Sequence, residues 1–156
     1  MSYVWSSGVS VTISPPPPPE VASVTITPER TEGVAPVTLE FKVTAVLDRE
    51  VYDWEKVDVE IVLAVNSKDN IVSKKTVTIS PGYKAKSAYL TYTFSKPGTY
   101  TVWGGARRVG SATYTYSPPV EITTHPAPTP ELKNLAITGA IAAIIVIAAS
   151  AIERRK

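Results

Sequence analysis

A run of acidic residues between positions 48 and 58 comes closest to a metal site in its residue types and spacing. Calcium prefers several carboxylate oxygens gathered at one loop. The spacing matches no established calcium loop, and Arg49 and Lys56 stand among the acids. A solvated hairpin is therefore the favoured interpretation, and a calcium site is the alternative. The candidate calcium ligands are Asp48, Glu50 and Asp53, followed in the sequence by Glu55 and Asp58.

Residue types that support catalysis are scarce. The chain has no cysteine, which excludes disulfides, thiolate metal sites and cysteine nucleophiles. Its single histidine, His125, lies in a proline-rich segment, where no packed neighbour would orient a general base or nucleophile. The sequence contains no glycine-rich phosphate loop and no histidine cluster. We therefore expect a protein that is not an enzyme and takes no cofactor.

Two positions suggest binding to a partner through charge. Arg107 and Arg108 follow Gly104-Gly105, a pair typical of a turn, and at a hairpin tip they could bind carboxylates or glycans. Alternatively, they only keep the surface soluble. The net charge is +2, so we expect no nucleic acid as partner. Several aromatic residues could also anchor an interface, although we expect most of them in the core: Tyr83, Tyr89, Trp103, Tyr114 and Tyr116.

The N-terminal arm, residues 1–14, has a strand-like pattern. Val9, Val11 and Ile13 alternate with serine and threonine, and the stiff proline run that follows prevents a tight hairpin with the next segment. We hypothesise that these three residues form a partner strand that adds to the sheet edge of a neighbouring subunit. The alternatives are an extra edge strand in its own domain, or disorder.

Strands and the turns between them must position the candidates within residues 21–124, because this stretch shows period-two alternation of apolar and polar side chains. The alternation is clearest at 37–47, 57–65 and 88–94, which we expect to be central strands. Weaker alternation occurs at 24–26, 71–79, 100–106 and 112–122. Turn residues lie at 66–70, 80–82, 96–98 and 104–105. About seven strands without a helix predict an all-β, immunoglobulin-like (Ig-like) antiparallel β-sandwich.

Two segments carry a family resemblance. The stretch Tyr92-Thr93-Phe94-Ser95-Lys96-Pro97-Gly98-Thr99-Tyr100-Thr101-Val102 resembles the penultimate hairpin of PKD-type Ig-like domains. Residues 33–41, with Gly33-Val34-Ala35-Pro36, are similar to an early strand of that family. The resemblance covers roughly residues 22–124. It implies a non-catalytic spacer or adhesion domain of surface proteins, notably in archaea and bacteria. The family's central Trp-x-Phe-Gly-Asp-Gly segment is replaced by Tyr52-Asp53-Trp54-Glu55-Lys56-Val57.

Spacers flank the predicted domain. Residues 15–20 begin with five prolines, which should form a polyproline II rod of roughly 15 Å. Residues 125–133 form a second, proline-rich stalk. The chain has no glutamine and one methionine, and this scarcity of thermolabile side chains suggests a thermophilic source.

Residues 134–152 are predicted to form a transmembrane helix. Residues 135–152 contain no charge and would span roughly 27 Å as a helix. A buried core helix is the alternative. The basic tail, residues 153–156, favours a cytoplasmic or interior C-terminus, with the domain outside the cell or on or in a virion. Residues 1–14 lack the features of a signal peptide. How the domain would reach the outside is therefore left with three alternatives. The chain is presented after processing, its export is unusual, or it is assembled from inside, as a virion component could be.

One face of the predicted helix carries small residues at helical spacing. Such a seam permits close packing between membrane helices, although many alanine-containing helices do not associate. The residues of this seam are Ala136, Gly139, Ala140 and Ala143.

These features together predict a single-pass, membrane-anchored structural protein of a virion or cell envelope that acts as a spacer and assembly module. Its expected partners are the lipid bilayer and other subunits of a membrane or capsid assembly, which include further copies of the chain if it forms a homo-oligomer. The alternatives are a surface adhesin or receptor-binding module, and an accessory single-helix subunit of a larger membrane complex.

Overall fold

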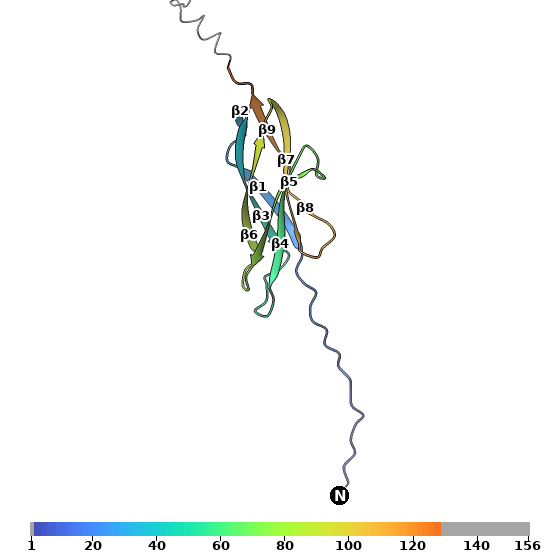
Figure 1. Ribbon diagram of the computed structural model, residues 1–156. Coiled ribbons are helices and arrows are strands. Elements are labelled where there is room, and N and C mark those ends of the chain that lie inside the picture. Colours follow the sequence, from blue (N-terminus) through green and yellow to red (C-terminus); the bar gives the residue numbers. More distant parts are fainter. Residues whose placement is uncertain (1, 129–156) are drawn as a thin grey trace, which may run out of the picture.

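A computed structural model describes residues 2–128, which form nine strands and no helix (Figure 1). The strands are β1 (Val21–Pro28), β2 (Glu32–Val34), β3 (Val37–Leu47), β4 (Val57–Val65), β5 (Ile71–Ile79), β6 (Ala85–Phe94), β7 (Gly98–Arg108), β8 (Thr115–Tyr116) and β9 (Val120–His125). The three clearest alternating stretches of the sequence all lie within strands.

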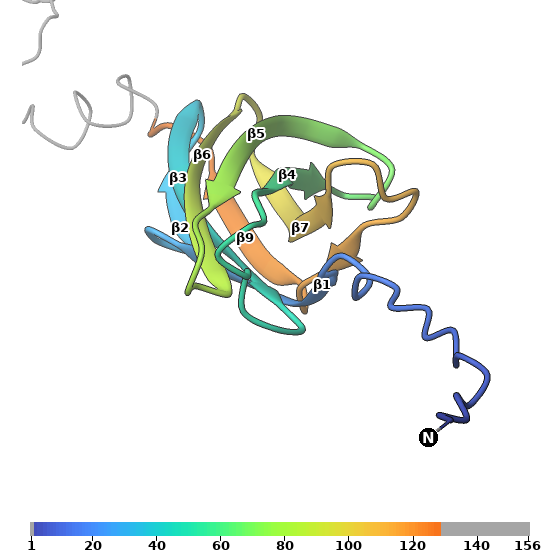
Figure 2. The ribbon, with the colours of Figure 1, turned by 90° about the horizontal axis from the view of Figure 1, so that it is seen from below.

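The strands form two sheets that pack face to face (Figure 2). The smaller sheet has the order β1-β3-β6, and the larger has the order β2-β9-β7-β4-β5, with β8 also paired to β7. Every pairing is antiparallel except that of β2 with β9. The predicted β-sandwich is therefore confirmed for the described residues.

Alternation along β3 shows how the sequence builds the core. Leu39, Phe41 and Val43 are fully buried between the sheets, whereas Thr38 and Lys42 face solvent. Burying a side chain such as phenylalanine contributes about 1.5–3 kcal/mol to the free energy of folding. A strand with this pattern is therefore most stable with its apolar face turned toward the core. The core is apolar, and it extends through both sheets.

The prediction that 88–94 is a central strand was wrong. This segment belongs to β6, which pairs only with β3 and forms an edge of the smaller sheet. Conversely, β7, whose alternation is weak, pairs with β4, β8 and β9. The physical reason is that alternation reports which face of a strand is buried, and not how many neighbours its backbone bonds.

The predicted turn at Gly104-Gly105 was also wrong, because both glycines lie inside β7. A Cβ atom on Gly104 would lie 2.8 Å from Cγ1 of Val43, and one on Gly105 would lie 2.7 Å from the ring of Tyr116. The two glycines thus allow close contact on opposite faces of the strand. Their role is packing.

The segment 112–122, predicted as one strand, is divided into β8 and β9. Between them, the buried Ser117 donates its backbone N–H to the Gly104 carbonyl at 2.8 Å, and its hydroxyl accepts the Gly104 N–H at 3.1 Å. Pro118 and Pro119 follow and have no N–H for a sheet ladder. Both short strands pair with β7.

The two ends of the described chain leave the sandwich at opposite poles (Figure 1). The N-terminal pole is the end where the proline run enters β1, and it carries the connections 48–56, 80–84 and 109–114. The C-terminal pole is the end where β9 finishes. Residues 2–20 form no strand and extend away from the N-terminal pole.

Residues 2–128 contain no helix that is long and apolar enough to span a membrane. The predicted transmembrane helix with its small-residue seam, the basic tail and part of the stalk lie outside the described residues.

Candidate functional site

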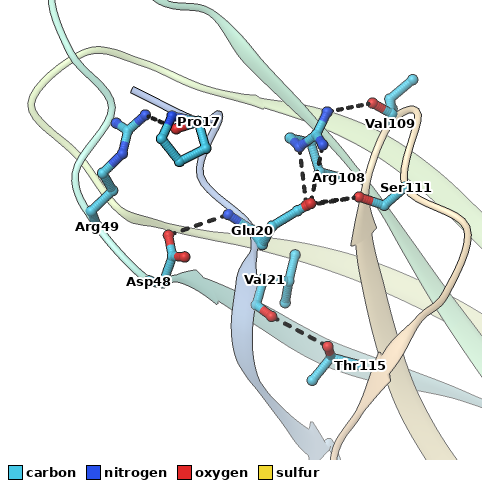
Figure 3. A network of polar contacts seen from close by, with 9 residues as sticks. All are labelled: Pro17, Glu20, Val21, Asp48, Arg49, Arg108, Val109, Ser111 and Thr115. Atoms are coloured by element: carbon cyan, nitrogen blue, oxygen red, sulfur yellow. Dashed lines mark hydrogen bonds and ion pairs between the residues drawn. The ribbon is translucent and has the colours of Figure 1, made fainter. Parts of the chain in front are cut away.

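The candidate site lies at the N-terminal pole, where Glu20 joins the proline run to the sandwich (Figure 3). Its carboxylate accepts hydrogen bonds from Nε and Nη2 of Arg108 at 3.1 and 3.0 Å, and from the hydroxyl of Ser111 at 2.7 Å. Its backbone exchanges hydrogen bonds with Asp48. The bonds from Arg108 and Ser111 lower the pKa of Glu20. Glu20 is therefore bound to the end of β7 and to the connections 48–56 and 109–114.

Arg49 provides a second attachment for the proline run. Its Nη2 donates to the carbonyl of Pro17 at 2.9 Å (Figure 3). The same guanidinium forms a two-point ion pair with Glu55, at 2.7 and 2.8 Å. The hydrogen bonds from Arg49 and from the Tyr52 backbone lower the pKa of Glu55 to about 2. The proline run is thus bonded to the domain at two points, at Pro17 through Arg49 and at Glu20 through Arg108 and Asp48.

The arm itself presents unpaired apolar side chains. Val9, Val11 and Ile13 are 87%, 77% and 86% exposed, and Tyr3 and Trp5 are also exposed. Residues 2–14 pair with no strand of the described chain, so the alternative of an edge strand in its own domain is wrong. The role of these residues as a partner strand stays a prediction.

Arg107 and Arg108 lie at the end of β7, beside the connection 109–114. Arg108 is paired with Glu20, as described above. Arg107 bonds Glu60 through Nε at 3.0 Å and Nη2 at 2.9 Å, and its guanidinium lies 4.4 Å from the ring centre of Tyr114. Both charges are thus balanced within the domain. Contact of these arginines with a partner stays a prediction.

Glu60 is the centre of a polar cluster on the outer face of the larger sheet. It accepts a hydrogen bond from the Tyr114 hydroxyl at 2.7 Å and lies 3.5 Å from Nζ of Lys74, in addition to its bonds with Arg107. The Tyr114 hydrogen bond, followed by that from Arg107, lowers the pKa of Glu60. Burial and the Glu60 carboxylate together raise the pKa of Tyr114 to about 12.

This cluster predicts a stability change in alkaline solution. The folded Tyr114 stays protonated at a pH where the unfolded chain, with a tyrosine pKa of about 10, has released its proton. Its contribution to stability should be fully present below pH about 10 and lost as the pH rises through about 12. An ultraviolet titration of tyrosinate should lose its latest step in Tyr114→Phe. The control Tyr3→Phe should retain that step, and a Tyr114→Phe titration identical to wild type would contradict the assignment.

The three calcium candidates are not arranged as a metal site. Asp48 accepts the backbone N–H of Glu20 at 3.2 Å. No hydrogen bond joins Asp48 to Glu50 or Asp53. Within residues 2–128, no group of three or more His, Cys, Asp or Glu side chains could hold a metal ion. His125, expected in the stalk, is the last residue of β9 and lies 3.6 Å from Glu32.

An exposed aromatic pair at the same pole is a feature that the sequence interpretation missed. Tyr52 and Trp54 stack with ring centres 4.9 Å apart and planes 23° apart, and they are 38% and 74% exposed. A Tyr-x-Trp motif in a connection without alternation was the available signal. The expectation that most other aromatic candidates are in the core was wrong, because all five are exposed or half-buried: Tyr83, Tyr89, Trp103, Tyr114 and Tyr116.

Comparison with known proteins supports the fold. No protein-family model and no curated protein matches the chain. The CARDB domain of the PF1109 protein from Pyrococcus furiosus, solved in complex with di-metal ions, has a TM-score of 0.52 and 12% identity over 68% of this chain and 93% of that domain. This likeness shows an Ig-like β-sandwich, as predicted, and at such identity it shows the fold alone.

Two further solved structures are similar at lower scores. The PKD domain of an M14-like peptidase from a Thermoplasmatales archaeon has a TM-score of 0.44 and 15% identity, over 69% of this chain and 96% of that domain. The cupredoxin domain of amoB from Nitrosocaldus yellowstonii has a TM-score of 0.46 and 15% identity, over 70% of this chain and 92% of that domain.

Proposed function

We propose that this Ig-like sandwich is a structural spacer and assembly module of a virion or cell envelope. In this proposal a bilayer anchor follows the C-terminal pole, and the N-terminal arm engages a neighbouring subunit. The protein works through geometry and catalyses no reaction. The resemblance of two segments to PKD-type domains, which often serve as spacers, agrees with this role.

The observation that carries the proposal is the placement of the two chain ends at opposite poles of the sandwich (Figure 1). The predicted anchor, residues 134–152, follows β9 in the sequence. The arm leaves from the other pole, so the domain separates the arm from the bilayer. A partner bound to the arm would then be held away from the membrane by the domain.

The attachment of the proline run to the domain supports a spacer role. Pro17 is bonded to Arg49, and Glu20 is bonded to Arg108 and Asp48. These bonds place the rod against the connections 48–56 and 109–114 instead of leaving a free hinge. A partner strand at residues 9–13 would therefore be connected to the sandwich through a proline run that is hydrogen-bonded to the domain.

Membrane anchoring can be tested by fractionation. We expect the full chain to stay with membranes through an alkaline carbonate wash, because its uncharged segment is long enough to span the hydrocarbon core. A chain ending at residue 133 should be released while its circular dichroism keeps the β-sheet signature. Release of the full chain by the same wash would contradict the anchor.

The side of the membrane can be tested with the same preparation. The chain has no cysteine, so Gly8→Cys places one thiol on the exposed arm. A membrane-impermeant maleimide should label it on intact cells or particles if the domain faces outward. Labelling only after lysis would place the domain inside, and would favour assembly from the interior of a virion.

A further inference from the structure

We infer that the exposed ring of Trp54, stacked on Tyr52, forms a platform that binds the ring of a neutral sugar at the N-terminal pole. This inference goes beyond the spacer role, because it gives the same pole a recognition surface for glycan or polysaccharide. It does not depend on the anchor or on the arm.

The exposure of the pair is the first observation. Trp54 is 74% exposed, and its ring stacks on Tyr52 and contributes nothing to the core between the sheets. Removing a large aromatic side chain from water is strongly favourable. A tryptophan kept at a loop tip, next to a second aromatic ring, is typical of a surface that a ligand covers.

Tyr52, the residue on which Trp54 stacks, is also held in place before any ligand arrives. The guanidinium of Arg49 lies 4.1 Å from the ring centre of Tyr52. Glu55 fixes that guanidinium with two hydrogen bonds and accepts the Tyr52 N–H at 2.8 Å. These contacts join both sides of the short loop that carries the aromatic rings. Binding would therefore require little ordering of side chains.

The connection 80–84 is hydrogen-bonded to the loop that carries Tyr52 and Trp54. Val51 is 2% exposed, and its N–H donates to the Tyr83 carbonyl at 2.9 Å. Its own carbonyl accepts the Gly82 N–H at 2.8 Å. The connections 48–56 and 80–84 thus form one tip of the sandwich. The exposed Tyr83 extends the aromatic character of this tip.

The surroundings of the platform indicate the class of ligand. The two rings border an open hollow of about 380 Å³, which Arg49, Glu50, Asp53 and Gly82 also line. The C–H face of a sugar ring can pack on an aromatic face, while its hydroxyl groups donate to the carboxylates of Glu50 and Asp53. Glu55 already pairs with the Arg49 guanidinium, so the carboxylates of Glu50 and Asp53 disfavour phosphate, sulfate and anionic lipid headgroups. The chemistry therefore fits an uncharged sugar.

Titration of the full chain in detergent with neutral oligosaccharides tests this inference. The panel contains gluco-, manno-, xylo- and N-acetylglucosamine oligomers at millimolar concentration, and binding is followed by tryptophan fluorescence and calorimetry. We expect at least one series to bind, and Trp54→Ala to weaken that binding at least tenfold. Glu50→Gln combined with Asp53→Asn should weaken it by a smaller factor.

The chain offers a matched control. Trp5 is 88% exposed on the arm, so Trp5→Ala removes an equally exposed tryptophan away from the platform and should leave binding unchanged. Circular dichroism checks that each variant is folded. Absence of binding across the panel, or equal binding by Trp54→Ala, overturns the inference. Binding to uncharged lipid vesicles that is lost in Trp54→Ala, without sugar binding, would assign the platform to a membrane surface instead.

Discussion

Replacing Phe94 by alanine should lower the free energy of unfolding by about 3–5 kcal/mol. Phe94 ends β6 and is 1% exposed. Its ring lies 4.8 Å from those of Tyr92 and Tyr100 and 6.3 Å from that of Phe41, centre to centre. Tyr100 belongs to β7 in the other sheet, so the substitution removes contacts that hold the two sheets together as well as the apolar area itself.

The measurement is chemical denaturation of a chain ending at residue 133, with Tyr89→Ala as the control. Tyr89 lies on the same strand, but it is 54% exposed on the outer face. A surface substitution of this kind should change stability by only about 0.5 kcal/mol. Similar losses in the two variants would mean that β6 does not present Phe94 to the core.

The bounds of β3, β4 and β5 were a part of the fold that the sequence could predict. The stretches 37–47, 57–65 and 71–79 have the bounds of β3, β4 and β5, because alternation changes at the residue where the chain leaves the sheet. Asn66, which begins the turn after β4, has a φ of 63°, a conformation that asparagine tolerates better than most residues. Local chemistry was sufficient at these positions.

Packing between distant segments could not be predicted in the same way. Gly104 and Gly105 are glycines because Val43 and Tyr116 lie against them, and neither neighbour can be inferred from the local sequence. Glycine pairs most often mark turns, so the sequence favoured the wrong interpretation. The number of neighbours that each strand pairs with could not be predicted either, because it depends on the strand order of the whole sheet.

The candidate site shows the same division. The pair Arg49 and Glu55 is separated by 6 residues and was open to local reasoning. Glu20 and Arg108 are separated by 88 residues, and their contact exists only because β1 and β7 belong to facing sheets. Arg108 therefore appeared to be a free surface charge in the sequence, whereas it attaches the proline run to the domain.

The aromatic platform and the arm share one pole, which joins the spacer role to the adhesin alternative. If the anchor holds the opposite pole near a bilayer, both features face away from it. A sugar polymer or a protein layer at that distance could be contacted by the same surface. The two activities are separable, because Trp54 belongs to the connection 48–56 and the partner strand lies in residues 9–13.

If the arm attaches to a partner subunit as proposed, changing Val9, Val11 and Ile13 together to serine should abolish that attachment. If the arm adds a strand to a partner sheet, these side chains lie on one face of that strand and become buried. Each buried apolar side chain contributes about 1.5–3 kcal/mol, and 1.4 kcal/mol corresponds to a tenfold change. The combined loss should therefore weaken attachment by at least about 100-fold.

Because the chain has no cysteine, attachment can be measured by placing one photo-crosslinker on Thr12→Cys, in the native envelope or particle. The arm with its three apolar residues should give one discrete crosslinked product, and the triple serine variant should give none. The matched control changes Ser10 and Ser14 to alanine, on the opposite face of the proposed strand, and should keep the product. An unchanged product in the triple serine variant would exclude strand addition through these residues, while the stacked Tyr52 and Trp54 would remain as an independent binding surface.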